Sequence, residues 1–314
     1  MLGLGVAVSY SPPLLRGTEE WPKIHQWLVG NAPVPNELEE ETAEVVQRHG
    51  KAIDAGYAEL RRQLAAYKPD ALVVLVTDSG RVFSQIQVPQ FACFMGAEIW
   101  GSTRYSGLGE KAEDDIVQLK CAPELAQFVE QQLIEHEFDM NHLHTFRPLG
   151  APEYGAPAAL VAGVRALTPE LDVPVVPIFV NAHMAPAPSG HRCYAFGRAL
   201  AAVLEDRPER VALVTIGGLS HDHHRPRAGW IDYLMDRWVL DRIARGKGSA
   251  LGSLYDVESD SVHGGVAEMR LWAAVAGACE ALGTKATVVD YIIAYSAATG
   301  IGFAYWPIAG AAPA

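Results

Sequence analysis

Four segments of the chain are almost continuously apolar, with little alternation between hydrophobic and polar positions. The segments are residues 4–10, 71–77, 173–180 and 210–216. Short runs of Val, Leu, Ile and Ala are typical of strands that are buried on both faces of a sheet. We therefore predict four strands of a central sheet that helices cover on both sides.

Helical periodicity occupies the stretches between these strands. Ile53, Tyr57, Leu60 and Leu64 follow one another at helical spacing and form one apolar face. Three further helices are predicted over residues 122–138, 189–206 and 266–283, with Ser189 as an N-cap and Gly283 as a C-cap. Strands that alternate with helices predict an α/β fold, and we expect one domain over residues 1–314.

Each predicted strand is followed by polar residues. Tyr10, Asp78, Ser79, His183 and His221 all come directly after or close behind the end of an apolar run. In open α/β sheets, ligands bind outside the carboxyl ends of the strands. These five side chains are therefore candidates for the lining of one cleft.

Charge and cysteine usage narrow the class of protein. The chain has 25 Lys and Arg against 37 Asp and Glu, a formal charge of -12, and its four cysteines form no CxxC pair. An acidic chain without a basic block is poorly suited to a nucleic-acid backbone. The apolar N-terminus lacks a basic region, and no apolar run reaches the roughly 20 residues that span a bilayer. We expect a cytoplasmic protein that binds neither nucleic acid nor membrane.

Several motifs, in one order, carry a resemblance to a known family. "GGLSHDHHRPRAGWIDYLMDRWVLDRI" (residues 217–243) is the longest, and "VPIFVNAHMAPAPSGHRCYAFGRAL" and "GGVAEMRLWAAVAGA" flank it. Together they resemble class III extradiol ring-cleavage dioxygenases of the LigB type, whose nearest member is the catalytic beta subunit of protocatechuate 4,5-dioxygenase. The likeness covers most of the chain except a divergent helical insert at about residues 17–66.

The resemblance implies a site, and the sequence departs from it. Family members bind one Fe(II) through two histidines and a glutamate, and a further histidine acts as acid/base. Glu268 takes the place of the glutamate and His221 that of the acid/base histidine, whereas Tyr10 and Ser79 stand where the iron-binding histidines would be. Tyr154 stands where the family has another active-site histidine. Because Fe(II) sites of this kind need imidazole donors, we predict that the iron is lost and that no cofactor replaces it.

We therefore predict an enzyme that acts on a phenolic or ring-derived carboxylate by metal-independent acid/base chemistry. Hydrolysis, decarboxylation, hydration and tautomerisation all remain open. His221 would be the acid/base, Glu268 its partner, and Tyr10 and Tyr154 hydrogen-bond donors. The candidate substrate-binding residues are Ser79, Asp78, His183, Ser220 and Arg227. The start of the helix near Ser189 would favour an acidic group on the substrate.

Two other hypotheses about the function remain open. One is a genuine Fe(II)-dependent ring-cleavage dioxygenase in which the metal is bound differently. The other is a non-catalytic subunit that accompanies an active partner subunit. His223 and His224 could also join His221 in a zinc site, although adjacent loop histidines usually point apart. The resemblance further predicts a homodimer.

Overall fold

The computed structural model describes residues 1–205 and 207–308, and an eight-stranded sheet forms their centre. The strand order is β6-β3-β7-β2-β8-β1-β10-β9, and β4 and β5 pair separately. The strands are β1 (Leu2–Val8), β2 (Ala71–Val76), β3 (Phe91–Phe94), β4 (Glu98–Ser102), β5 (Ile116–Lys120), β6 (Met140–Leu143), β7 (Val175–Val180), β8 (Val211–Ile216), β9 (Thr287–Ala294) and β10 (Thr299–Pro307).

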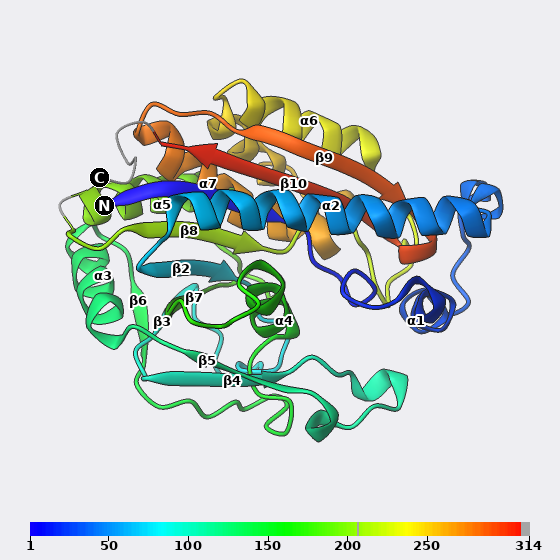
Figure 1. Ribbon diagram of the computed structural model, residues 1–314, viewed down its shortest axis with the longest axis horizontal. Coiled ribbons are helices and arrows are strands. Elements are labelled where there is room, and N and C mark those ends of the chain that lie inside the picture. The colour runs from blue at the N-terminus through cyan, green and yellow to red at the C-terminus, as the bar shows by residue number, and fades with distance from the viewer. Residues whose placement is uncertain (206, 309–314) are drawn as a thin grey trace.

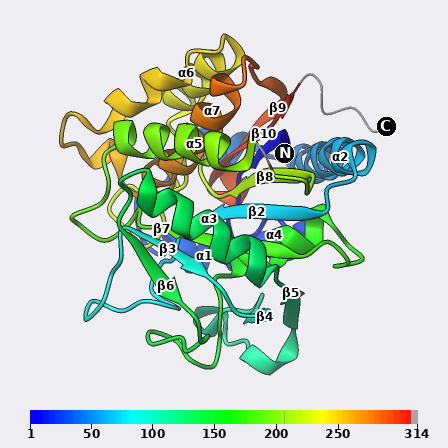
Figure 2. The same ribbon diagram turned by 90° about the vertical axis from the view of Figure 1, so that its left-hand side faces the viewer.

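Helices cover both faces of this sheet (Figures 1 and 2). They are α1 (Trp21–Val29), α2 (Ala43–Tyr67), α3 (Pro123–Glu135), α4 (Ala158–Leu167), α5 (Gly190–Glu205), α6 (Tyr233–Ala244) and α7 (Met269–Ala281). Helices α3, α5, α6 and α7 contribute to the core on one face, whereas α2 and α4 contribute to the core on the other. The strands between the two layers are therefore buried on both sides.

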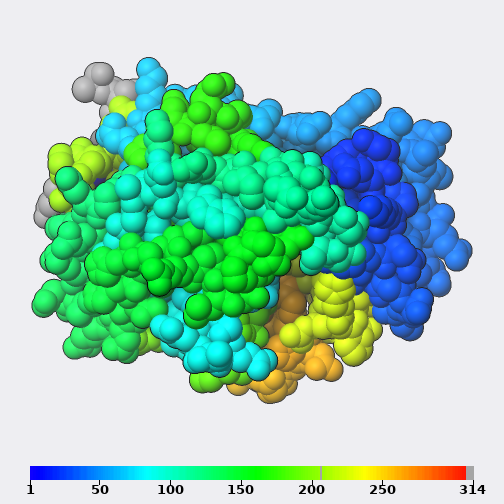
Figure 3. Space-filling model, turned by 90° about the horizontal axis from the view of Figure 1, so that it is seen from below, coloured from blue at the N-terminus to red at the C-terminus, as the bar shows by residue number. Residues whose placement is uncertain are grey.

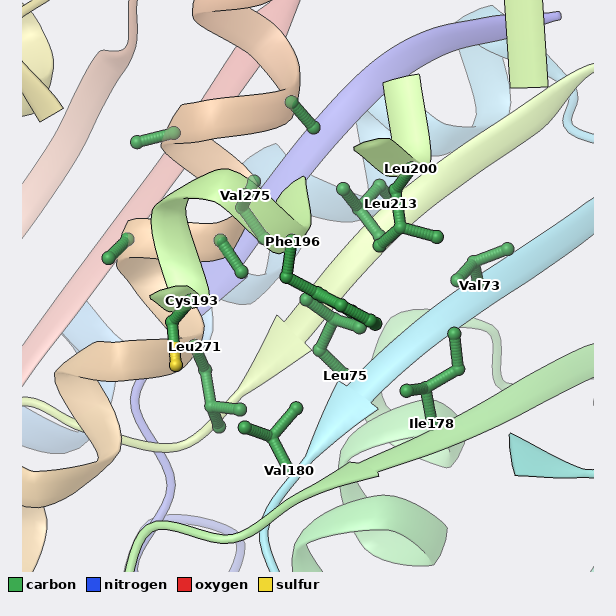
Figure 4. Close-up of a cluster of buried hydrophobic side chains, with 14 of the residues drawn as sticks. Val73, Leu75, Ile178, Val180, Cys193, Phe196, Leu200, Leu213, Leu271 and Val275 are labelled. Atoms are coloured by element: carbon green, nitrogen blue, oxygen red, sulfur yellow. The ribbon is translucent and has the colours of Figure 1, made fainter. Parts of the chain in front are cut away.

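In the core between the sheet and the α5–α7 pair, the Phe196 ring packs among aliphatic side chains and stacks on Phe91 with ring centres 4.5 Å apart. Phe196 of α5 lies between strand residues such as Leu75 and Leu213 and helix residues such as Val275 (Figure 4). All of these side chains are buried. Burial of apolar surface on this scale is the main stabilising contribution to such a fold.

The predicted elements agree with the structure. The four apolar segments form β1, β2, β7 and β8, and every residue of these strands is buried. The apolar stripe from Ile53 to Leu64 is the buried face of α2. Ser189 caps α5 by accepting a hydrogen bond from the Arg192 N–H, and Gly283 has a positive φ of 74° just after α7. The last residue of the predicted third helix, Asp206, lies outside the described residues.

Strands β7, β2, β8 and β1 are neighbours and run parallel to one another. Their carboxyl ends therefore meet at the same border of the sheet, as the polar residues after each apolar run predicted. Figure 3 shows the molecule hollowed between a green segment and the yellow segment that follows β8, with orange chain at the floor of the hollow. This border is where the predicted site residues are found.

The hydrophobic pattern did not reveal every element. Strand β10 pairs antiparallel with β1 and β9 pairs antiparallel with β10, and in β9 only Ile292 and Ala294 are buried. The short strands β3 and β6 complete the opposite end of the sheet. Within residues 1–205 and 207–308, no helix is both long and apolar enough to cross a membrane.

Candidate functional site

The turn after β8 is shaped by two glycines. Gly217 and Gly218 have φ values of 142° and 61°, which L-residues with side chains rarely adopt. A Cβ atom on Gly217 would lie 2.5 Å from the Glu268 carboxylate. Trp272 donates its indole N–H to the Gly217 carbonyl, and the Ser9 hydroxyl oxygen accepts from the Leu219 N–H. The turn is thereby held from α7 and from the end of β1.

The Glu268 carboxylate lies between two imidazoles at this turn. His183 Nε2 is 2.9 Å from Glu268 Oε1, His221 Nε2 is 3.7 Å from the same oxygen, and the Gly218 N–H donates to Oε2 at 2.6 Å. Burial alone would raise the pKa of Glu268, but the imidazoles of His221 and His183 outweigh it and lower this pKa. The carboxylate is therefore ionised at neutral pH.

His221 is buried and held by its backbone neighbours. Its Nδ1 lies 3.1 Å from the Leu219 carbonyl, and its own carbonyl accepts from the Gly265 N–H at 2.5 Å. A carbonyl can only accept, so Nδ1 carries the proton in this contact and Nε2 faces Glu268. Burial would lower the pKa of His221, but the Glu268 carboxylate outweighs it and raises this pKa. The imidazole therefore holds a proton more readily than a free histidine side chain does.

Two tyrosines predicted for the site belong to a second cluster, of phenols around Arg81. The hydroxyls of Tyr10 and Tyr105 lie 3.0 Å apart, and the Tyr154 hydroxyl donates to the Glu110 carbonyl at 2.8 Å. The Arg81 guanidinium lies 5.1 Å from the ring centre of Tyr105 and 5.2 Å from that of Tyr154. Burial, followed by the neighbouring Tyr105, raises the pKa of Tyr10. Tyr10 is therefore a neutral phenol.

Asp78 and Ser79 are placed differently from each other. The Asp78 carboxylate accepts hydrogen bonds from the backbone N–H groups of Gly80, Arg81, Val82 and Phe83. Its oxygens therefore organise the loop after β2. The Ser79 side chain is exposed to solvent. The loop order that Asp78 provides fixes the position of Arg81.

Ser220, His221 and Arg227 line one small cavity of about 20 Å³. Arg227 donates to the Ser261 hydroxyl and lies 3.9 Å from the Asp232 carboxylate. Two larger hollows, of about 560 and 620 Å³, lie near α2 and near β6, away from these residues. The small cavity contains the buried His221 imidazole and has room for about one water molecule.

His223 and His224 lie in different surroundings. The His223 ring packs 4.9 Å from the His221 ring, whereas the His224 ring packs against Trp27. Burial, together with the neighbouring His221, lowers the pKa of His223 well below its ordinary value. In the described part of the chain, no group of three or more His, Cys, Asp or Glu side chains is arranged to hold a metal.

The residues at the positions that the resemblance assigns to iron do not fit Fe(II). The Tyr10 hydroxyl is engaged with Tyr105, and the Ser79 hydroxyl faces solvent. Only Glu268 offers an anionic donor there, and it already accepts from His183 and the Gly218 N–H. A neutral phenol, a serine and one engaged carboxylate are a poor donor set for this cation.

Three residues that matter at this border were not predicted from the sequence. Ser9 ties the end of β1 to the turn after β8 and also accepts from the Gly302 N–H. Arg81 supplies the cation of the phenol cluster, and Tyr105 pairs with Tyr10. Ser9 had a signal, because it directly follows an apolar run. Tyr105 had none, because it is remote from every predicted strand end.

The sequence is similar to those of known aromatic ring-opening dioxygenases. A family model described as "Catalytic LigB subunit of aromatic ring-opening dioxygenase" matches residues 35–305. Gallate dioxygenase of Pseudomonas putida is 33% identical over 121 residues, which cover 38% of this chain and 34% of that protein. A 2,3-dihydroxyphenylpropionate/2,3-dihydroxicinnamic acid 1,2-dioxygenase of Klebsiella pneumoniae is 26% identical over 182 residues, which cover 57% and 52%. The chain thus spans between about a third and about half of these relatives' lengths.

A solved structure shares the fold over nearly the whole chain. The crystal structure of an uncharacterized protein from Escherichia coli K12 matches with a TM-score of 0.53 and 13% sequence identity. The match covers 96% of this chain and 99% of that one. At this identity the likeness concerns the fold alone.

Proposed function

The chain belongs to the LigB family of aromatic ring-opening dioxygenases, and from that premise we propose a metal-independent enzyme that acts on a phenolic or ring-derived carboxylate. The single observation that carries the proposal is the pairing of Glu268 with two imidazoles. In this arrangement both imidazoles face the same carboxylate oxygen. A buried, ionised carboxylate beside an imidazole is a recurrent acid/base arrangement.

His221 is the proposed acid/base. Its Nε2 lies 3.7 Å from Glu268 Oε1, which exceeds hydrogen-bond length, so Nε2 remains free to accept a proton from a substrate. A phenolic hydroxyl or an enol of the substrate would exchange a proton with Nε2. The Glu268 charge would stabilise the imidazolium that forms, and the bond from His183 would keep Glu268 in place.

The phenol cluster is the proposed hydrogen-bonding wall of the site. One of the two hydroxyl protons of Tyr10 and Tyr105 is used in their mutual contact, which leaves the other for a substrate oxygen. The Tyr154 proton is donated to the Glu110 carbonyl, so its oxygen is left to accept from a substrate hydroxyl. This refines the prediction that both Tyr10 and Tyr154 act as donors.

The substrate class follows from the same residues. Gallate and 2,3-dihydroxyphenylpropionate, which appear in the names of the relatives, are both phenols that carry a carboxylate. Arg227 lines the cavity of His221 and is the proposed partner of such a carboxylate. The substrate would displace the loose contact between Arg227 and Asp232, which measures 3.9 Å.

The test is a panel of phenolic and ring-derived carboxylates, followed by chromatography and NMR in the presence and absence of a metal chelator. We expect turnover that the chelator leaves unchanged and that His221→Gln reduces by roughly 10²-fold or more. His136→Gln, at an exposed position just after α3, is the matched control and should keep full activity. Turnover that requires both Fe(II) and O₂ would overturn the proposal.

A second candidate function is Fe(II)-dependent ring cleavage at a displaced site. The observation that favours it is the set of possible ligands. The Nε2 atoms of His183 and His221 face one carboxylate oxygen of Glu268, and two histidines with one carboxylate are a usual donor set for Fe(II). Its test is iron retention after anaerobic loading. Near-stoichiometric iron that is lost in His183→Ala would favour this candidate. No turnover under any condition would favour a non-catalytic subunit.

A further inference from the structure

A fully buried carboxylate lies behind the His221 turn and takes no part in the chemistry described above. Asp236 is in the first turn of α6 and is 0% exposed. Its Oδ1 accepts from the Ser220 N–H at 3.0 Å and from the Ser220 hydroxyl at 2.6 Å. One carboxylate oxygen thus holds both the backbone and the side chain of the residue that precedes His221.

The other oxygen of Asp236 is held from a different part of the sheet. Tyr291, in β9, donates its hydroxyl to Asp236 Oδ2 at 2.6 Å. The Gly300 N–H, in β10, donates to the Ser220 carbonyl at 2.7 Å. A Cβ atom on Gly300 would lie 2.1 Å from Asp236 Oδ2, so only glycine lets the strand approach this closely. Three elements therefore converge on Ser220.

The position of Ser220 determines what His221 can do. The Leu219 carbonyl, on the other side of Ser220, accepts the proton of His221 Nδ1. If Ser220 turned, this carbonyl would move away from the imidazole, and the proton could occupy Nε2 instead. The tautomer of His221 is therefore linked to the grip of Asp236 on Ser220.

We propose that Asp236, supported by Tyr291, is a positioning residue that keeps His221 in the Nδ1-protonated tautomer with Nε2 directed at Glu268. The inference rests on the proposed function for its consequence in catalysis. The geometry on which it stands is independent of any substrate. Asp236 acts through Ser220 and the turn, and it does not touch the reacting atoms.

The free-energy cost of burying the Asp236 carboxylate indicates that its role is more than packing. Among residues 1–205 and 207–308, no basic side chain forms an ion pair with it. Burial raises its pKa to about 6, although hydrogen bonds from Ser220 and Tyr291 oppose this shift. An apolar side chain at this position would remove the charge but would leave the Ser220 N–H and the hydroxyls of Ser220 and Tyr291 without their acceptor. The charge is therefore kept together with a set of hydrogen bonds that specify the position of Ser220.

The experiment reads the tautomer of His221 directly. At a pH above the pKa of His221, protein labelled with ¹⁵N at histidine gives distinct imidazole signals for the two neutral tautomers, and His221→Gln identifies the signals of His221. We expect the Nδ1-protonated form in the wild type and a mixture with the Nε2-protonated form in Asp236→Leu. Asp236→Asn should restore the wild-type pattern, because its amide oxygen still accepts from Ser220.

Controls separate positioning from general destabilisation. Asp241→Asn changes an Asp of the same helix that pairs with Arg245 at the surface, and it should leave the tautomer unchanged. Should Asp236→Leu fail to fold, Tyr291→Phe and Ser220→Ala each remove one hydroxyl that donates to Asp236, and each should give a smaller shift. A folded Asp236→Leu, or folded Tyr291→Phe and Ser220→Ala proteins, with the wild-type tautomer would overturn the inference. Because no substrate is used, this result does not depend on the proposed activity.

Discussion

Two buried carboxylates close to one turn have opposite properties because their neighbours differ. Glu268 faces imidazoles, which lower its pKa, whereas Asp236 faces hydroxyls and a backbone N–H, which do not offset its burial. The first is suited to stabilise a positive charge that develops on His221. The second holds a backbone segment in place. Residue type alone would not separate these two roles.

The raised pKa of Asp236 predicts a pH dependence of stability. Its pKa is about 6 in the fold against an ordinary value of 3.8, so between these values the native state binds more protons than the unfolded state. The free energy of unfolding should therefore fall as pH rises from about 4 to about 7, by roughly 3 kcal/mol from this group. Urea unfolding at several pH values measures it.

Asp236→Asn is the comparison for this measurement, because the amide does not ionise. Its unfolding free energy should lack the Asp236 contribution and should fall less over the same pH range. If the curves for the wild type and Asp236→Asn run parallel, the pKa of Asp236 is not raised in the fold.

At the scale of elements, the site depends on parallel strands whose carboxyl ends share one border, with helices packed closely behind them. Helices α5 and α7 approach most closely at Gly197, where a Cβ atom would lie 1.7 Å from the Ala274 carbonyl oxygen. This pair covers the sheet face behind the turn, and α7 directly follows Glu268 and carries Trp272. Its packing therefore supports the position of the Glu268 carboxylate.

Gly197→Ala should force these two helices apart. Overpacking in a dense core typically costs about 1–3 kcal/mol, which exceeds the roughly 1 kcal/mol that Ala gains over Gly in helix propensity. We expect a net loss in the free energy of unfolding, measured by urea denaturation. Ala195→Gly, at an exposed position of the same helix, should cost about 1 kcal/mol. A Gly197→Ala protein more stable than the wild type would contradict the close approach.

Across the whole molecule, the acid/base turn follows β8 and Tyr10 of the phenol cluster follows the parallel neighbour β1, so both lie at the same border of the sheet. The donor set there predicts weak Fe(II) binding. After anaerobic loading and desalting, elemental analysis should find far less than one iron per chain, with a ring-opening dioxygenase relative prepared in parallel as the positive control. Stoichiometric iron would contradict this prediction and would show that the protein binds the metal, either at Tyr10 and Ser79 or at another site.

The state of association also belongs to this scale. The family resemblance predicts a homodimer, and light scattering coupled to size-exclusion chromatography would measure the mass in solution. A mass of one 33.9 kDa chain would contradict this prediction.

The sequence by itself determined the strands that are buried on both faces and the helices between them. Burial on both sides of a strand leaves a continuous apolar run, and one buried helix face leaves a period of 3.6 residues, so both are written locally. The same pattern indicated that His183 and His221 each follow a buried strand, and the motif around Trp272 pointed to Glu268. Strand β9 was not predicted because its half-exposed residues give a weaker hydrophobic pattern.

The partners of these side chains could not be predicted from the sequence and are seen in the fold alone. The pairing of Glu268 with His183 joins residues 85 positions apart, and the Tyr10–Tyr105 contact joins residues 95 positions apart. The exposure of Ser79, the commitment of Asp78 to its own loop and the contact of Asp236 with Tyr291 likewise depend on folding. Hydrogen bonds between distant segments leave no periodic trace in the chain, because each partner is chosen by the geometry of the fold and not by its neighbours in sequence.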